Sequence, residues 1–202
     1  IERVESGGTP KTTNDEFWDG DVLWLTPKEI TRNGSGLFVS DTERKITELG
    51  VKKSSAKIMP KGTVMLTKRA PVGAVAIAAE SICSNQGFLN FVCGGKLIPA
   101  YLAEWFKINK PYLDAVANGS TYAELYKIDL FEFHMCIPPL KEQEHILNVI
   151  SCIRRLINSF EMIERSSVNF DKVSEIQSRK RKLEKLEKEM TPILLSGGIK
   201  NL

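Results

Sequence analysis

Hydrophobic and polar positions divide the chain into two parts of different texture. Up to about Pro139, short apolar runs alternate with turn-forming segments such as SGGTPK, WDGD, MPKG and SNQG. Dense punctuation of this kind is typical of strands joined by loops. The runs predicted as strands are residues 22–25, 63–67, 74–78 and 88–92, of which 74–78 is too continuously apolar to face water.

One helix is predicted within this first part. It begins after Pro99, and Asn118-Gly119 supplies a stop signal. The apolar positions that recur near helical spacing are Leu102, Trp105, Phe106, Leu113, Val116 and Ala117. Strands and a helix in one stretch of about 140 residues predict a mixed α/β domain.

The second part begins after Pro138-Pro139. No proline or glycine occurs in the 51 residues from Leu140 to Met190, and Pro192 and Gly197-Gly198 follow. Apolar residues recur there at spacings of three and four, which predicts one long amphipathic helix of about 75 Å. The expected fold class is therefore α+β, a mixed α/β domain (1–138) followed by a long helical region (139–202).

Such a helix extends far beyond its own small domain, so its apolar stripe needs a second long helix. That helix could come from a second copy or from the rest of a longer polypeptide. Ser166-Ser167 fall where apolar residues are expected, which favours antiparallel coiled-coil pairing or a local break over a parallel zipper. The residues predicted to form the pairing seam are Ile146, Ile150, Ile153, Ile157 and Phe160.

Composition agrees with a globular protein and excludes several classes. The chain has 42% hydrophobic residues, and its 28 basic and 25 acidic side chains are divided unevenly. From Leu140 onward 12 are basic and 9 acidic, so the first 139 residues hold 16 of each. No apolar run approaches the length of a membrane span, and the first residues show no secretory signal. The four cysteines lack metal-ligand spacing, so reduced thiols in a cytoplasmic protein and no metal are expected.

The sequence shows no catalytic machinery. No glycine-rich phosphate loop follows a strand, and the two histidines provide no nucleophile triad. Three segments instead have residue types suited to a polyanion: residues 7–13, 67–71 and 118–122. They combine backbone N–H groups, hydroxyls and cations, although each alone is more often a solvated loop. The basic run 179–182 is interpreted as mainly a solvated or partner-facing helix surface.

Taken together, the motifs resemble one family. They are SGGTPKTTNDEFWDGDVLWLTPKEI, KGTVMLTKRAPVGAVAIA, NQGF and NGSTYAELYKIDLFEFHMCIPPLKEQEHI, in that order and followed by the helical region. This combination strongly resembles the specificity (S) subunit of type I restriction-modification systems, over essentially the whole chain. Members commonly have two target-recognition domains and two helical regions, whereas this sequence has one of each.

The resemblance implies a noncatalytic DNA-recognition subunit. In the family, each recognition domain reads one half of a bipartite target in the major groove, and antiparallel helices hold the two domains apart. Methyltransferase (M) subunits dock on the helices and methylate adenine with S-adenosylmethionine, while a restriction (R) subunit adds ATP- and Mg-dependent cleavage. Cofactors therefore belong to the partners, and a single-domain chain is expected to form a homodimer through its helix. A neutral recognition domain draws little on counterion release, so M subunits would supply many phosphate contacts.

The residues expected to face DNA come from the three polyanion-reading segments and two further positions. They are Thr9, Lys11, Lys28, Lys68, Arg69, Gln86, Ser120, Thr121 and Tyr122. Arg69 could form two parallel hydrogen bonds to guanine O6 and N7. For Gln86, a purely structural role in a turn between strands is an equal alternative. The alternative from another class is a scaffolding protein whose globular domain binds protein and whose helix dimerises it. A self-contained methyltransferase or nuclease fragment is disfavoured, because its cofactor and acid motifs are absent from the sequence.

Overall fold

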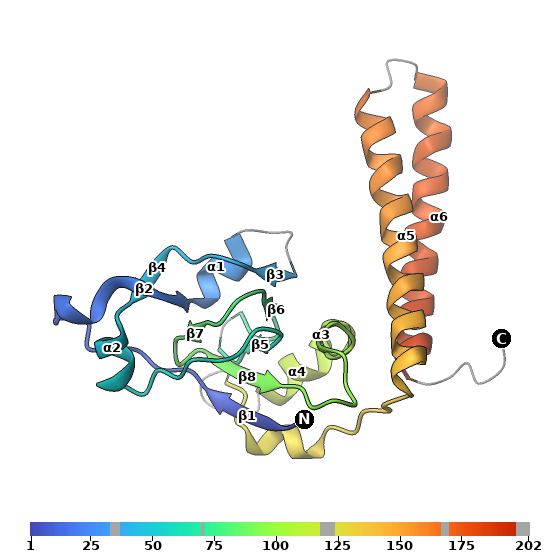
Figure 1. Ribbon diagram of the computed structural model, residues 1–202. Coiled ribbons are helices and arrows are strands. Elements are labelled where there is room, and N and C mark those ends of the chain that lie inside the picture. The colour runs from blue at the N-terminus through green and yellow to red at the C-terminus, as the bar shows by residue number, and fades with distance from the viewer. Residues whose placement is uncertain (33–36, 70, 118–123, 167–169, 197–202) are drawn as a thin grey trace. The chain divides into compact units, whose positions relative to one another are not determined.

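The structure is a computed structural model that describes residues 1–32, 37–69, 71–117, 124–166 and 170–196. It separates into two compact units, Ile1–His134 and Met135–Leu202. The stop signal Asn118-Gly119 and the pair Gly197-Gly198 lie outside the described residues. Figure 1 shows the strands gathered in the first unit and the two longest helices in the second.

The first unit contains two sheets. The five-stranded sheet has the order β1 (Arg3–Ser6), β8 (Phe88–Val92), β5 (Val64–Thr67), β6 (Val75–Ala78) and β3 (Phe38–Val39). The three-stranded sheet has the order β4 (Arg44–Ile46), β2 (Trp18–Leu25) and β7 (Cys83–Ser84). Pairing is antiparallel except between β3 and β6 and between β2 and β7. The four predicted strands are confirmed as β2, β5, β6 and β8.

The core of the first unit lies on β5 and β6, all of whose residues are buried. This burial explains the continuous apolar run 74–78, since a strand with no solvent-facing side has no need for alternating polar residues. Helix α3 (Pro99–Ile108) packs against both strands. Its Phe106 ring meets Phe91 of β8 at a centroid distance of 4.9 Å, which ties the helix to the sheet.

The prediction of one helix after Pro99 is wrong in one respect, because α3 ends and α4 (Lys110–Ala117) begins after it. The Asn109 side chain donates to the Trp105 carbonyl at 2.8 Å and closes the end of α3. Pro111 follows, and in a continuous helix its ring would clash with the carbonyl four residues earlier. The remaining helices of the unit are short: α1 (Pro27–Arg32), α2 (Glu48–Lys52) and the 3-10 turns Asp15–Phe17 and Ile128–Glu132.

The second unit is a pair of antiparallel helices, α5 (Leu140–Ser166) and α6 (Phe170–Leu195), which lie side by side (Figure 1). Three side-chain pairs fix the register: Arg154–Glu187, Glu161–Lys180 at 2.9 Å and Glu164–Gln177 at 2.7 Å. From one pair to the next, the position on α5 rises by as many residues as the position on α6 falls. This constant register is that of an antiparallel coiled coil formed within one chain.

The prediction of a single long helix over residues 140–190 is therefore wrong. Two helices of 27 and 26 residues replace it, so each is about 40 Å long rather than 75 Å. The apolar stripe is interrupted at the polar pair Ser166-Ser167, and folding back lets α5 bury its stripe against α6. The inference that the stripe needs a helix from outside this chain fails for the same reason. Helix α6 also continues through Pro192 to Leu195, instead of ending at the proline.

Candidate nucleic-acid interface

The loop 7–11 is held close to the turn 84–87, far away in sequence. The Gly8 backbone N–H donates to the Ser84 carbonyl at 2.8 Å, and Gly7 donates to Phe88 at 3.4 Å. A Cβ on Gly7 would lie 1.9 Å from the Asn85 carbonyl oxygen, nearer than any side-chain carbon can come. Gly7 of the SGGTP motif is thus required by this close approach of two backbones, and a Cβ on Gly8 would lie 2.3 Å from the Ser55 backbone carbon.

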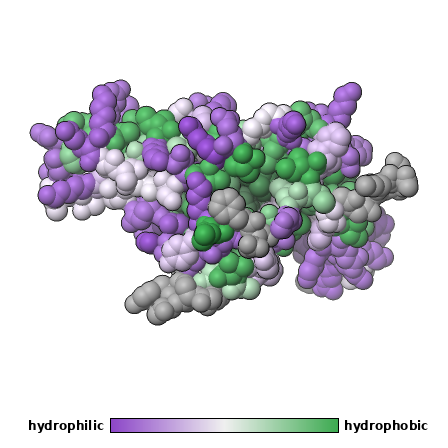
Figure 2. Space-filling model, turned by 90° about the horizontal axis from the view of Figure 1, so that it is seen from below, coloured by the Kyte–Doolittle hydropathy of each residue, from purple (hydrophilic) through white to green (hydrophobic). Residues whose placement is uncertain are grey.

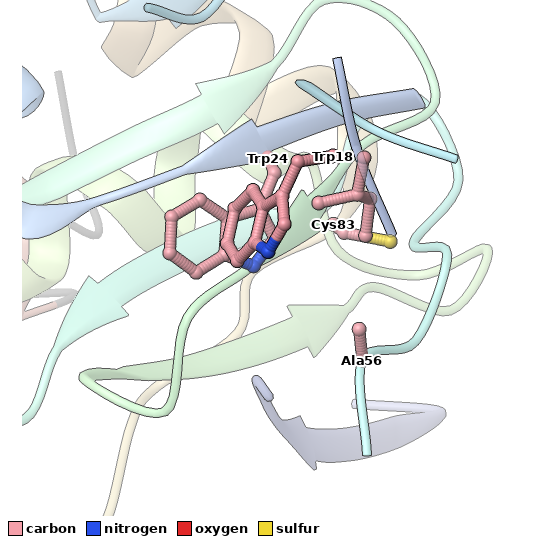
Figure 3. Close-up of a cluster of buried hydrophobic side chains, with 5 residues drawn as sticks. Trp18, Trp24, Ala56 and Cys83 are labelled. Atoms are coloured by element: carbon pink, nitrogen blue, oxygen red, sulfur yellow. The ribbon is translucent and has the colours of Figure 1, made fainter. Parts of the chain in front are cut away.

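Two buried tryptophans fix the same loop from the sheet beneath it. The Trp24 indole Nε1 donates to the Gly8 carbonyl at 2.9 Å, and the Trp18 Nε1 donates to the Lys11 carbonyl at 3.3 Å. The two rings meet edge to face with centroids 5.0 Å apart. Figure 3 shows them together with Ala56 and Cys83, their indole nitrogens on the same side of the pair. The loop is therefore a positioned part of the domain rather than a free tether.

The turn 84–87 connects this loop to the end of β5. The Thr9 hydroxyl donates to the Gln86 side-chain carbonyl, and the Lys68 backbone N–H donates to the Gly87 carbonyl at 2.8 Å. Three residues predicted from separate motifs, Thr9, Gln86 and Lys68, are thus brought onto one continuous surface. Gln86 is exposed but also bonded to Thr9, so the turn-pinning role considered for it is compatible with a surface role.

Glu124 closes this surface by binding both cations of the 67–71 segment. Its carboxylate accepts from Lys68 Nζ at 2.9 Å and from Arg69 Nε at 3.0 Å. The side chains of Lys68 and Glu124 are only 13% and 11% exposed, whereas that of Arg69 is 52% exposed. A backbone hydrogen bond joins the same two segments, since the Leu125 N–H donates to the Lys68 carbonyl at 2.8 Å. Arg69 is the member of the pair that presents its guanidinium to solvent.

Electrostatics explain why Glu124 stays ionised in this position. Burial raises its carboxyl pKa, but hydrogen bonds and charge attraction from Lys68 and Arg69 outweigh burial, and the net pKa lies below the ordinary value. The Lys68 charge is consequently neutralised inside the domain. Of the two predicted cations, Lys68 is mainly a structural ion-pair partner of Glu124. Arg69 is the one exposed enough to contact a ligand.

The other predicted residues divide into two groups. Lys11 and Lys28 are exposed, and Pro27, the neighbour of Lys28, lies so near Gly87 that a Cβ there would be 2.9 Å from the proline ring. This contact places the start of α1 beside the turn 84–87. Ser120, Thr121 and Tyr122 lie outside the described residues. The pairing-seam residues belong to the second unit, where Ile146, Ile150, Ile153 and Ile157 are buried on α5 and Phe160 is half-buried.

Sequence reasoning missed Arg44, an exposed residue of β4. Its guanidinium carbon lies 3.6 Å from the centre of the Trp18 ring and 5.6 Å from that of Trp24. Arg44 is the cross-strand partner of Trp24, so the contact depends on strand register. A sequence pattern could have found this residue only if the pairing of β2 with β4 had been known.

The described residues offer little for chemistry of their own. Within them, no group of three or more His, Cys, Asp and Glu side chains could hold a metal ion. Burial raises the thiol pKa of Cys83 to about 12 and that of Cys93 to about 11, so both are poor nucleophiles. In the same part of the chain, no helix is long and apolar enough to span a bilayer. Figure 2 shows a face where hydrophilic side chains are interspersed with smaller hydrophobic groups.

A small α/β unit that gathers loops into one polar surface, together with an antiparallel helical pair, defines a recognition module. The comparison with protein families agrees: residues 1–165 match the type I restriction modification DNA specificity domain. The chain belongs to this family. The sequence-based assignment to the noncatalytic specificity subunits is thereby confirmed.

Curated relatives carry the same description. The MjaIX specificity subunit of Methanocaldococcus jannaschii is 40% identical over 161 residues, which are 79% of this chain and 37% of that protein. The EcoR124I/EcoR124II specificity subunit of Escherichia coli is 26% identical over 76% of this chain and 39% of its own length. The chain thus spans less than half the length of these relatives.

Two solved structures share the fold. The HsdS subunit from Thermoanaerobacter tengcongensis is similar with a TM-score of 0.57 and 18% identity, over 96% of this chain and 42% of that one. A chain from a study of complex assembly and conformational transition of the type I R-M system has a TM-score of 0.60 at 18% identity, over 96% and 43%. The expected α+β fold with paired helices is confirmed by this likeness.

Proposed function

We propose that this chain reads one half of a bipartite DNA target in the major groove and directs adenine-N6 methyltransferase and restriction subunits to it. Residues 1–138 would form the target-recognition domain, and residues 139–202 the spacer and the docking surface for the methyltransferase subunits. S-adenosylmethionine, ATP and Mg would bind to the partners, in the cytoplasm. The observation that carries the proposal is the continuous surface formed by loop 7–11, turn 84–87 and the end of β5.

This surface has the properties of a sequence reader. Hydrogen bonds join its backbone segments to one another, so ordering its side chains on binding costs little conformational entropy. It combines hydroxyl, amide and guanidinium groups, which can match base edges as well as phosphates. Its net charge is low because Glu124 neutralises part of the cationic charge, and tight binding would therefore depend on further phosphate contacts from the methyltransferase subunits.

The proposal is tested by co-expressing the chain with its methyltransferase subunit and mapping methylated adenines in DNA from cells with and without the chain. A bipartite methylated motif that depends on the chain is expected. Co-purification of the two subunits without any such motif would favour the scaffolding alternative. If neither occurred, membership of an active complex would be refuted.

Arg69 offers the sharpest variant for this assay. Arg69→Ala should weaken specific binding by about 1 to 3 kcal/mol if the guanidinium contacts a base. Lys57→Ala is a matched control, because Lys57 is also an exposed, ion-paired cation of the first unit. Unchanged target methylation by the Arg69 variant would remove this residue from the interface.

We further propose that a second recognition half completes the subunit, supplied by a second copy in a homodimer or by the rest of a longer polypeptide. The helical pair still exposes Leu156, Met162 and Leu186, at 46%, 73% and 41%. Exposed apolar side chains of this kind are available for contact with a further helical partner. Light scattering of the purified chain separates the alternatives, since only a homodimer doubles the mass of this chain alone.

A further inference from the structure

Arg44 stands out as a cation held in one orientation by aromatic rings. Its guanidinium lies over the Trp18 ring at 3.6 Å, and both tryptophans beneath it are buried, with exposures of 6% and 4%. Stacking occupies the flat face of a guanidinium but leaves its N–H edge available for hydrogen bonds. Among the described residues, no carboxylate pairs with Arg44, whereas the neighbouring Lys45 is bound to Asp41 at 3.2 Å.

The position of Arg44 links it to the proposed interface. The indoles that support the guanidinium also hold the Gly8 and Lys11 carbonyls of loop 7–11. Loop 7–11 and the Arg44 guanidinium are therefore positioned by the same two indole rings. The strand also restricts the side chain, because the Thr42 hydroxyl donates to the Arg44 carbonyl at 2.7 Å and accepts from the Trp24 backbone at 3.1 Å.

The charges on the segment that carries Trp18 indicate what the Arg44 guanidinium would bind. The segment that carries Trp18 also carries four exposed carboxylates: Asp15, Glu16, Asp19 and Asp21. These charges repel a DNA phosphate but not the neutral edge of a base. A rigid, stacked guanidinium has the geometry to pair with the O6 and N7 acceptors of guanine.

From these observations we propose that Arg44 reads a guanine in the target half-site. The inference rests on the proposed function, since it assumes that loop 7–11 faces DNA. It adds a specificity-determining residue on β4, whereas Arg69 follows the end of β5, and both cations would read the same half-site. Trp18 and Trp24 act as positioning residues, because they orient Arg44 without touching DNA.

The experiment uses the full chain in complex with its methyltransferase subunit and a pool of randomised duplex DNA. Bound sequences are selected and read for the wild type, Arg44→Lys and Arg44→Ala. The wild type should select guanine at a position where both variants relax by about 5- to 150-fold, with selection elsewhere unchanged. Lys45→Ala, which removes a neighbouring charge, should keep the guanine. Arg44→Lys matters most, since it retains the charge and the fold but loses the planar fork.

The outcomes separate this inference from the proposed function. If the wild type selects a motif and Arg44→Lys selects the same motif with equal strength, the guanine contact is overturned and the proposed function stands. A uniform loss of affinity across all sequences in Arg44→Ala would show a phosphate contact and would also overturn it. If the wild-type complex selects no motif at all, both the inference and the proposed function fail.

Discussion

Replacing Glu124 by Gln tests whether the Lys68–Glu124–Arg69 cluster stabilises the recognition domain. At 2.9 and 3.0 Å, each ion pair has a Coulomb energy of about 5 to 6 kcal/mol at an effective dielectric of 20. Dehydration of the groups offsets most of this energy, and a hydrogen bond to a charged group contributes about 1.5 to 3 kcal/mol net. The bond to Arg69 contributes little because that side chain is half exposed. The expected loss is therefore about 2 kcal/mol.

Urea unfolding followed by tryptophan fluorescence is a suitable assay, because all three tryptophans lie in the first unit. Glu48→Gln is the matched control: it breaks a pair with Lys52 whose side chains are 82% and 72% exposed, and it should cost less than about 0.5 kcal/mol. The double variant Glu124→Gln/Lys68→Met should lose at least about 1 kcal/mol less than the sum of the single variants. Additive losses, or a loss at Glu124 no larger than the control, would refute the structural role of the cluster.

The same variant gives a pH dependence with a defined sign. The folded-state pKa of Glu124 is lowered from the ordinary value of 4.5, so its contribution is complete above that value. As the pH falls below 4.5 and through the folded pKa, protonation removes the contribution. The stability difference between the wild type and Glu124→Gln should thus shrink on acidification below pH 4.5. A difference that stays constant or grows would contradict the assigned charge state.

Three further predictions concern other parts of the molecule. Trp24→Phe removes the donor to the Gly8 carbonyl and should cost about 1 to 3 kcal/mol in urea unfolding, whereas a loss below 0.5 kcal/mol would show that the indole does not fix the loop. Ile150→Ala, at a side chain 2% exposed, should lower the stability of the chain by about 2 to 4 kcal/mol in thermal unfolding followed by helical circular dichroism; exposed Leu156→Ala should have a much smaller effect. At pH 8, a thiol reagent should modify exposed Cys152 well before Cys83, and equal rates would contradict the burial of Cys83.

The strands that sequence reasoning found are those whose signal is purely local. Apart from Thr63 and Thr67, segments 63–67 and 74–78 are apolar because both of their faces are buried, and such runs stand out without knowledge of the fold. Strands β3 and β7 have two residues each, so they carry no periodic pattern. They become strands only because β6 and β2 provide parallel partners. Pairing of this kind depends on tertiary structure, so the sequence of either segment alone does not predict a strand there.

The candidate site shows the same division between local and long-range information. The motifs around Gly8, Arg69 and Gln86 could be selected from sequence because their residue types suit a polyanion. The stack of Arg44 on Trp18 could not, since it needs the register that places Arg44 opposite Trp24. The binding of Lys68 by Glu124 was also missed, because the two residues are 56 positions apart in sequence.

Because α5 and α6 pair within one chain, the symmetry of the DNA target becomes the test of whether two copies associate. Burial of the α5 stripe against α6 means that this chain does not need a second copy to hide its most apolar residues. The exposed Leu156 and Leu186 still allow two such pairs to associate, and two identical chains would be related by a twofold axis. Two identical recognition domains must read a palindromic bipartite motif, whereas a second half of different sequence reads an asymmetric one. A palindromic methylated motif would therefore support the homodimer. An asymmetric motif would refute it and show that this chain works with a second recognition half of different sequence.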